Sequence, residues 1–336
     1  MTNSTNVQSI PGRDLSVRMI SLLCASILLL SGCDRGFGRA KTAFDGQAAL
    51  GYVKAHLAFG PRTPGTAAHD SAAAWIVAQM KQRTDSVSVQ RWTQTTADGT
   101  KLPLQNILAR FNPAATQRVL YVTHWDTRPK ADDDPNFGNK ARPILGANDG
   151  ASGVGLFIAL GDVFKKTPPS VGVDLLFVDG EDWGAFDSDS AGHYPDALFG
   201  SQYFASHLPS ATYKPLFGVL WDMIGDADLQ LYQESNSVQR APEVVSRVWQ
   251  TAADLGYSKY FISQVGQQIT DDHVPLLDKG LRVIDVLDIQ YGPLPAGHDA
   301  FTASSPNYHH TMQDTFDKVS AKSLQVVGDV AVTLVK

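Results

Sequence analysis

Short apolar runs alternate with segments of helical spacing along most of the chain. The clearest run, residues 171–178, is followed at once by three acids, Asp179, Glu181 and Asp182. An apolar run of this length, bounded by turn residues, predicts a strand that is buried on both faces, as in a parallel sheet. Similar or alternating runs predict further strands at residues 85–92, 104–111, 118–123, 216–221, 260–263 and 282–287.

Apolar residues at three- and four-residue spacing predict helices between these strands. One helix opens in the glycine-rich segment 146–155 and runs to about residue 165. The other predicted helices cover residues 43–59, 67–83, 197–207, 242–255, 272–279 and 321–336. This alternation predicts a single doubly wound α/β domain over residues 43–336, with a mostly parallel central sheet flanked by helices.

The first 33 residues have the pattern of an export signal. Arg13 and Arg18 precede an apolar run at residues 19–30, which is short for a membrane span and has the length of a signal-peptide core. The run ends in LSGC, which resembles the lipobox of bacterial lipoproteins, and this implies lipidation of Cys33. An ordinary signal peptide at residues 1–33 is the alternative.

Either signal predicts an exported protein of the bacterial cell envelope. A lipid on Cys33 would tether the domain to a membrane, facing the periplasm or the exterior, without spanning that membrane. Residues 34–42 are polar and are expected to serve as the tether.

Composition narrows the classes of partner and of site. The chain has 336 residues, a formal net charge of −6 and no basic block, so nucleic acid is not an expected partner. The only cysteines are Cys24 and Cys33, which excludes a disulfide framework and a cysteine-built zinc site. A metal site in this chain must therefore be built from histidine and carboxylate.

Polar residues stand at or just past the ends of several predicted strands. Because parallel strands place their carboxyl ends at one edge of a sheet, these side chains are expected to converge on one crevice. Histidine and carboxylate together are the ligands that suit zinc and related divalent ions. The residues are His124, Asp126, Asp149, Glu181, Asp182, Asp222, His309 and His310.

Several of these residues also have a plainer interpretation. His124 is compatible with a hydrogen-bonded histidine at a strand end, and Asp149 with a helix N-cap. Asp222 suits a turn, and His309 and His310 suit an exposed pair. Their joint appearance at successive strand ends favours the metal interpretation.

Six short motifs occur in the order found in one known superfamily. They are H-x-D at 124–126, GAND at 146–149, DGED at 179–182, DMIG at 222–225, DDHVPLL at 271–277 and HTMQD at 310–314. Together they resemble the motifs of the zinc aminopeptidase-like metallopeptidases and, more closely, of the glutaminyl cyclases (glutaminyl-peptide cyclotransferases) built on the same fold. Segments 64–70, 106–113 and 196–208 also resemble cyclase segments, so the likeness covers most of residues 43–336.

The resemblance implies a role for each matching residue. Asp149, Asp182 and His310 would hold a zinc ion. Glu181 would act as the general acid and base, and Asp222 and Asp271 would complete a hydrogen-bonded set that moves protons.

A second metal is implied by the peptidase side of the resemblance. In the two-zinc peptidases, the counterparts of His124 and Asp222 hold a second ion that is bridged through Asp149. A cyclase would therefore carry one zinc ion per chain and a peptidase up to two. Asp126 would orient His124, as carboxylates commonly do beside metal-binding histidines.

The implied substrates are the N-termini of peptides or proteins. A cyclase converts an N-terminal glutamine to pyroglutamate and releases ammonia, whereas a zinc aminopeptidase hydrolyses the first peptide bond. Asp271 favours the cyclase, because aminopeptidases of this family usually carry Ser or a similar residue there. The third alternative is a non-catalytic binding module on the same fold, although such relatives lose ligands that this chain retains. The oligomeric state is left open.

The chain departs from the animal cyclases mainly around the substrate pocket. Asp182 replaces a Glu, His309 replaces a Trp that lines the pocket, and Asp285 replaces a His of the hydrogen-bond network. Trp183 and Tyr308 are expected either to supply apolar walls in their place or to pack in the core.

Overall fold

The computed structural model describes residues 42–292 and 308–336. Cys33, the expected export signal and nearly all of the expected tether lie outside these residues, as do residues 293–307. Within the described ranges, no helix has both the length and the apolar character needed to cross a membrane.

Six strands form the central sheet of the described part. In chain order they are β1 (Ser86–Thr95), β2 (Lys101–Phe111), β3 (Arg118–His124), β4 (Gly172–Val178), β5 (Phe217–Asp222) and β8 (Val283–Leu287). Their order across the sheet is β1-β2-β4-β3-β5-β8. β4, β3, β5 and β8 run parallel, which confirms the predicted fold class, whereas β1 and β2 form an antiparallel hairpin at one edge.

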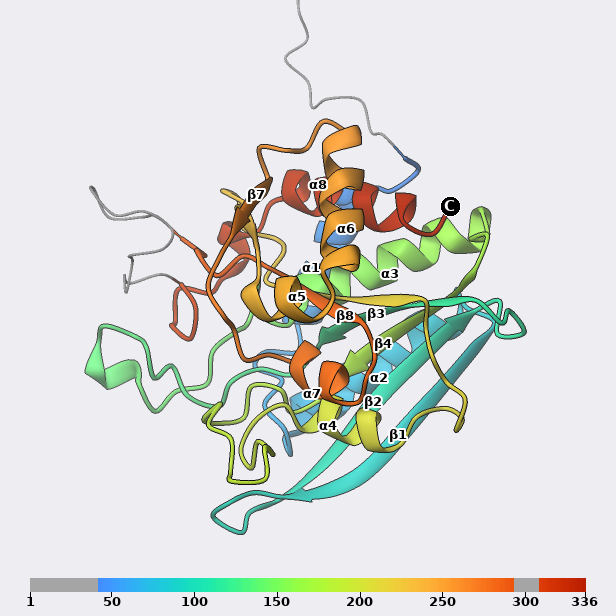
Figure 1. The fold of residues 1–336 in the computed structure, drawn as a ribbon. Coiled ribbons are helices and arrows are strands. Elements are labelled where there is room, and N and C mark those ends of the chain that lie inside the picture. Colours follow the sequence, from blue (N-terminus) through green and yellow to red (C-terminus); the bar gives the residue numbers. More distant parts are fainter. Residues whose placement is uncertain (1–41, 293–307) are drawn as a thin grey trace, which may run out of the picture. The chain divides into compact units, whose positions relative to one another are not determined.

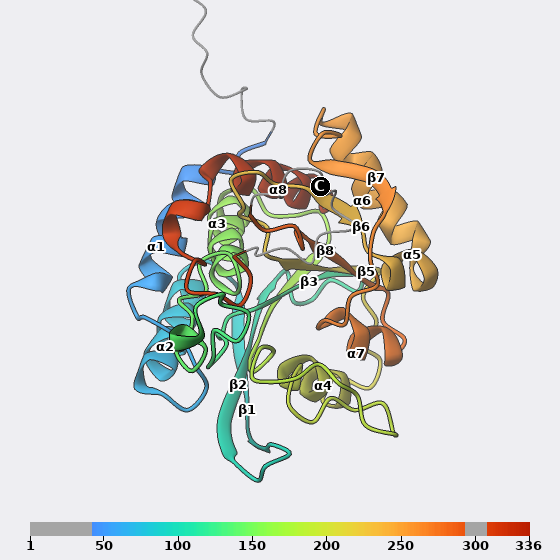
Figure 2. The same ribbon diagram turned by 90° about the vertical axis from the view of Figure 1, so that its left-hand side faces the viewer.

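Helices cover both faces of this sheet (Figures 1 and 2). On one face lie α1 (Gly46–Leu57), α2 (Ala67–Lys81), α3 (Ala151–Lys166) and α8 (Ala321–Thr333). On the other lie α4 (Phe199–Ser206) and α7 (His273–Asp278). The two remaining helices, α5 (Ser235–Arg240) and α6 (Pro242–Asp254), pack against β8.

Two layers of helix favour strands that are apolar on both faces, because successive side chains of a strand point to opposite faces. In β4, Leu175 and Phe177 join the large core that also contains α1, α3 and α8. Leu176 and Val178 join the smaller core on the other face, together with Phe204 of α4. This burial on both sides explains the apolar character of residues 171–178; the one buried acid within them, Asp174, forms ion pairs with Arg110 and Arg118.

A glycine lets α3 approach the sheet closely. A Cβ atom added to Gly153 would lie 1.9 Å from Oγ1 of Thr123 and 2.9 Å from the carbonyl oxygen of Trp221. The first turn of α3 therefore packs with its backbone against the ends of β3 and β5. This contact places the segment before α3, which contains Asp149, at the carboxyl edge of the sheet.

Three short elements differ from the sequence-based expectation. The strand expected near residues 260–263 is β7 (Phe261–Val265), which pairs with β6 (Leu231–Gln233) in a separate two-stranded sheet. β6 and α5 were not expected. They span three and six residues, which is too short for a hydrophobic period to show.

Candidate metal centre

A cleft of about 450 Å³ opens at the carboxyl ends of the parallel strands. Its walls include Glu181, which follows β4, Asp222 at the end of β5, and Leu287 at the end of β8. This edge is where open α/β sheets bind their ligands. The side chains that the sequence placed at successive strand ends therefore meet in one place.

Five of the expected residues form two groups that share Asp149. In the His124 triad (His124, Asp149 and Asp222) and in the Asp182 triad (Asp149, Asp182 and His310), the potential ligand atoms lie within 4.8 Å of one another. Nε2 of His124 is 3.0 Å from Oδ1 of Asp149 and 3.1 Å from Oδ1 of Asp222. Nε2 of His310 is 3.1 Å from Oδ1 of Asp182. Their assignment as metal ligands stays a prediction.

The donor set of both triads suits a cation. Oδ2 of Asp149 and Oδ2 of Asp182 are buried and have no hydrogen-bond partner among the described residues. A buried polar atom without a partner costs about 1–3 kcal/mol, and more for a charged group. A divalent ion held by the Asp182 triad would contact these oxygens, and imidazole with carboxylate is a zinc-type donor set.

The turn that carries Asp149 is fixed by residues that sequence reasoning missed. Oδ2 of Asp314 accepts a hydrogen bond from the backbone N–H of Asp149 at 3.2 Å. The buried guanidinium of Arg62 donates to the carbonyl oxygen of Gly146 at 2.8 Å. The N-cap of α3 is Gly150, at a φ of 91°, so the alternative interpretation of Asp149 as the helix N-cap is wrong.

Charge keeps the shared carboxylate ionised. Burial alone would raise the pKa of Asp149, but its hydrogen bond to His124 and the charge of that imidazole lower it well below the usual value. Burial opposes the charge on His124, yet the carboxylates of Asp222 and Glu181 raise its pKa well above the usual value. The buried carboxylates therefore depend on a positive charge among them.

Asp126 holds the backbone that presents Glu181 and Asp182. Its Oδ1 accepts a hydrogen bond from the N–H of Glu181 at 3.2 Å, and its Oδ2 accepts one from the N–H of Asp182 at 3.3 Å. The expected contact with Nδ1 of His124 spans 3.7 Å, an ion-pair distance that is too long for a hydrogen bond. Asp126 thus acts on the acids after β4 more directly than on His124.

Glu181 has the environment of a proton-accepting group. Its Oε2 lies 3.6 Å from Nδ1 of His124. Burial raises the pKa of Glu181 well above the usual value; the charges of Asp182 and Asp271 add to the rise, and His124 opposes it. A general base near neutral pH needs such a shift.

Further buried carboxyl groups surround the cleft. Asp271 lines the cleft with Asp222, and burial together with the charge of Asp222 raises the pKa of Asp271 well above the usual value. Burial also raises the pKa of Asp272 to about 7. Asp285 in β8 is buried without a hydrogen-bond partner for either carboxylate oxygen among the described residues, and burial raises its pKa too. Carboxyl groups that keep their protons near neutral pH are typical of proton-transfer sites.

Asp179, the first acid after β4, does not take part in the cleft. Its Oδ1 lies 2.8 Å from Nε2 of His69, and its Oδ2 accepts a hydrogen bond from the N–H of Gln105 at 2.7 Å. The ring of His69 stacks on Trp125 with centroids 4.4 Å apart. This acid therefore anchors α2 and β2 to the end of β4.

Arg128, in the loop after β3, is a cleft residue that sequence reasoning also missed. Its Nη1 donates to Oδ1 of Asp182 at 2.8 Å and to the carbonyl oxygen of Gly184 at 2.9 Å. Its Nε and Nη2 each donate to a carboxylate oxygen of Asp132 at 2.7 Å. One feature of the sequence could have indicated Arg128. It lies only four residues after His124, at the start of the long charged loop.

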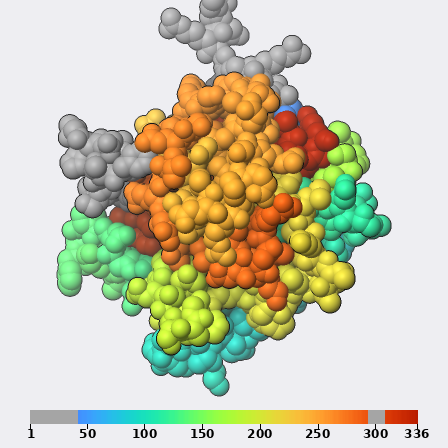
Figure 3. Space-filling view, in the orientation of Figure 1, coloured from blue at the N-terminus to red at the C-terminus, as the bar shows by residue number. Residues whose placement is uncertain are grey.

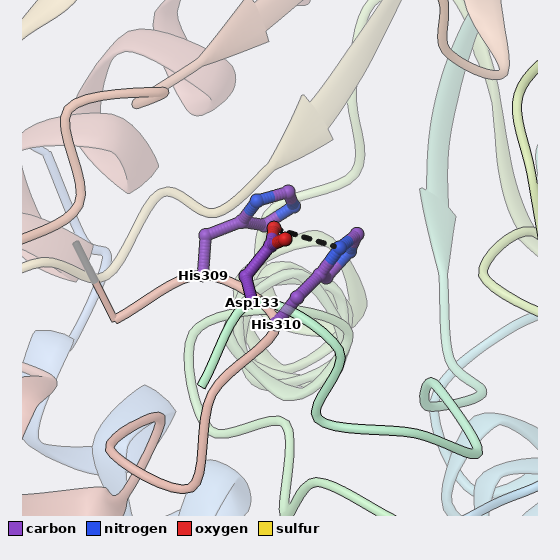
Figure 4. A group of neighbouring side chains, drawn as sticks. All are labelled: Asp133, His309 and His310. Atoms are coloured by element: carbon purple, nitrogen blue, oxygen red, sulfur yellow. Dashed lines mark ion pairs between the residues drawn. The ribbon is translucent and has the colours of Figure 1, made fainter. Parts of the chain in front are cut away.

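His310 and His309 occupy different positions. His310 is buried and belongs to the Asp182 triad, whereas Nε2 of His309 lies 4.0 Å from Oδ2 of Asp149. The two rings stack with centroids 3.5 Å apart, and the carboxylate of Asp133 approaches Nδ1 of His310 at 3.7 Å (Figure 4). The interpretation of the two histidines as a simple exposed pair is therefore wrong for His310.

The apolar walls of the cleft are not the aromatic residues that the sequence suggested. Trp183 packs beside the cluster of Leu102, Leu104 and Phe199, and Tyr308 packs edge-on against Tyr291. Both thus take the core-packing alternative. The apolar residues that line the cleft are Ala185, Phe186, Met223, Ile269, Leu287 and Ile289.

Comparison with known proteins agrees with this geometry. The bovine glutaminyl-peptide cyclotransferase is 25% identical over 245 residues, which cover 64% of this chain and 63% of the bovine protein. The glutaminyl cyclase of Tannerella forsythia superimposes with a TM-score of 0.78 at 36% identity, covering 87% of this chain and 98% of that one. A Zn-dependent exopeptidase from Parabacteroides distasonis superimposes with a TM-score of 0.79 at 34% identity, covering 87% and 98%.

The family model for peptidase family M28 matches residues 106–335, a span that begins in β2 and ends just after α8. This span contains every residue of both triads together with Glu181 and Asp271. The chain belongs to peptidase family M28.

Proposed function

We propose that this protein is a zinc-dependent glutaminyl-peptide cyclotransferase. The observation that carries the proposal is the meeting, in one cleft, of Glu181 with Asp222 and Asp271, beside the Asp182 triad. Cyclisation needs one group that accepts a proton from an amine and returns it to a leaving ammonia. A buried glutamate with a raised pKa, surrounded by other protonatable carboxyl groups, suits that exchange.

The proposed reaction assigns a step to each residue. A zinc ion held by Asp149, Asp182 and His310 would supply Lewis-acid polarisation of the side-chain amide carbonyl of an N-terminal glutamine. Glu181 accepts a proton from the α-amine as the amine nitrogen bonds to the amide carbon. The carbon–nitrogen bond of the amide then breaks, and Glu181 returns the proton to the departing ammonia.

Asp222 and Asp271 would support this proton transfer from positions in the same cleft as Glu181. Both line the cleft, and burial together with the charge of Asp222 raises the pKa of Asp271 well above the usual value, so Asp271 favours its protonated form. A shared proton between the two would hold them as a hydrogen-bonded pair. That pair would keep the negative charge near Glu181 constant while its proton moves.

A zinc aminopeptidase is the second candidate function, and one observation favours it. The His124 triad supplies a second set of potential ligands that shares Asp149 with the first. Two ions bridged by one carboxylate suit the activation of a water molecule for hydrolysis. In that reaction Glu181 would take its proton from water and not from the substrate amine. The relatives reported above are enzymes, so a non-catalytic binding module has no support.

The two reactions leave different products. Protein lacking residues 1–33 should be offered one peptide that begins with Gln and one that begins with Leu. A cyclase releases ammonia from the first and nothing from the second. Release of free leucine without ammonia would contradict the proposal and support the aminopeptidase. Two tightly bound zinc ions per chain would also support the aminopeptidase.

We further propose that residues 43–336 form the catalytic domain of an exported lipoprotein, with residues 34–42 as its tether. The support is the signal-like segment that ends at Cys33. A lipid on Cys33 would hold the cleft at a membrane surface, where it meets the N-termini of exported peptides. Replacing Cys33 with Ser should move the protein from the membrane fraction to the soluble fraction. Unchanged membrane association in that variant would contradict lipidation.

A further inference from the structure

We propose that Asp133, His309 and the Nδ1 side of His310 form an additional zinc site at the mouth of the cleft. This outer site is distinct from both triads, because neither contains Asp133 or His309. Its occupant would be a weakly bound Zn²⁺ ion that obstructs the cleft when the free zinc concentration is high.

The three side chains come close enough to share one ion. Their potential ligand atoms all lie within 4.8 Å of one another. Asp133 lies in the loop after β3, whereas the two histidines belong to the segment before α8, and the three side chains converge in Figure 4. The side chain of Asp133 is 64% exposed and that of His309 is 24% exposed, so the group is open to solvent.

The two nitrogens of His310 face different groups. Nε2 lies 3.1 Å from Oδ1 of Asp182, and Nδ1 lies 3.7 Å from Oδ2 of Asp133. One ring can therefore serve the Asp182 triad through Nε2 and the outer site through Nδ1. Because Asp133 and His309 are open to solvent whereas the residues of the Asp182 triad are buried, we expect the outer site to bind less tightly than the Asp182 triad.

The donors select the kind of ion. Two imidazoles and one carboxylate form a zinc-type set, whereas Mg²⁺ and Ca²⁺ prefer oxygen ligands alone. The nearby positive charge of Arg128 does not exclude a cation, because Arg128 forms ion pairs with Asp132 and Asp182.

The position of the outer site predicts its effect. Asp133, His309 and His310 all line the cleft. An ion held by them would stand where a peptide N-terminus must pass to reach Glu181. This inhibition rests on the proposed function, but the binding of the ion does not.

Zinc binding by the purified full-length protein tests the site without reference to activity. Equilibrium dialysis over a range of Zn²⁺ concentrations should show a weak class of site in addition to the tight class. Asp133→Asn should weaken the weak class by at least about tenfold and leave the tight class unchanged. His309→Asn should weaken the same class, and excess Mg²⁺ should not compete for it.

The matched control is Asp187→Asn, which removes an exposed carboxylate beside the cleft residue Phe186. This control should keep both classes of site. A wild-type protein with no weak class, or a weak class that survives both Asp133→Asn and His309→Asn, would overturn the proposal. If the weak class behaves as expected but no ammonia is released from Gln-peptides, only the proposed function fails.

Discussion

Arg128 engages one carboxylate oxygen of Asp182 and leaves the other without a hydrogen-bond partner among the described residues. The engaged oxygen is Oδ1, 2.8 Å from Nη1, and the remaining Oδ2 is buried. Burial raises the pKa of Asp182, and the charge of His310 and, to a smaller extent, that of Arg128 oppose that rise. Arg128 therefore orients this shorter carboxylate and favours its ionised form.

Removing this guanidinium should weaken zinc binding. In Arg128→Met, the pKa of Asp182 should rise further, so a proton competes with the metal, and the carboxylate loses its orientation. We expect about tenfold weaker zinc binding, with a larger loss at pH 6 than at pH 8. Competition with a chelator at both pH values measures this. Arg142→Met, an exposed change on the same loop, should have no effect, and equal affinities for Arg128→Met and wild type would remove the assigned role.

The role of Glu181 can be separated from metal binding. Glu181→Gln keeps the size and polarity of the side chain but cannot accept a proton. Turnover should fall by about 100- to 10,000-fold, the typical contribution of a positioned general base. The zinc content, measured by elemental analysis, should remain that of the wild type. Near-wild-type turnover would exclude Glu181 as the base.

The two adjacent histidines should differ in their effect on tightly bound zinc. His310→Ala removes a member of the Asp182 triad and should lower the tight zinc content, whereas His309→Ala should not. Elemental analysis after dialysis against metal-free buffer distinguishes the two. Loss of tight zinc in His309→Ala alone would show that the assignment is displaced by one residue.

The buried carboxyl groups predict how zinc and pH act together on stability. The pKa of Asp272 rises from 3.8 to about 7 on folding, so the folded chain binds more protons than the unfolded chain between these values. Asp272 therefore contributes to the free energy of unfolding of the metal-free protein. This contribution is fully present below about pH 4 and is lost as the pH rises through about 7.

A bound cation offsets that loss, since it stabilises the ionised carboxylates around it. The gap in melting temperature between zinc-loaded and chelator-treated protein should therefore widen from pH 5 to pH 8. In Asp272→Asn the metal-free protein should lose less stability over the same range. A gap that is constant with pH would contradict this account.

Replacing either of two helical glycines with alanine should change the stability of the protein, but in opposite directions. Gly153 lies in the close contact between α3 and the sheet, whereas Gly51 lies outside that contact. Gly153→Ala would force a Cβ against Thr123 and should destabilise the protein by about 1–3 kcal/mol, as overpacking does. Gly51 in α1 has open space around its Cβ position, so Gly51→Ala should stabilise the protein by about 0.5–1 kcal/mol. Denaturant unfolding of both variants measures the difference. Equal effects would show that the close approach at Gly153 is not a constraint.

Much of the fold and of the candidate site followed from local pattern and topology. The apolar run of β4 predicted a strand buried on both faces, and its parallel neighbours predicted that acids and histidines at strand ends would meet. The residues that position them could not be found this way, because their contacts join distant segments. Arg62 reaches Gly146 over 84 residues, Arg128 reaches Asp182 over 54, and Asp314 reaches Asp149 over 165.

Two residues of the His124 triad and several cleft walls come from different parts of the architecture. His124 and Asp222 are the last residues of β3 and β5, whereas Phe186, Ile269 and Ile289 belong to connecting segments. Loops accept substitution more readily than buried strands. Substitutions in these segments can therefore change the walls of the cleft while His124 and Asp222 keep their positions at the strand ends. Such changes in the cleft walls offer one way for glutaminyl cyclases and zinc-dependent exopeptidases to diverge on the fold that both share with this chain.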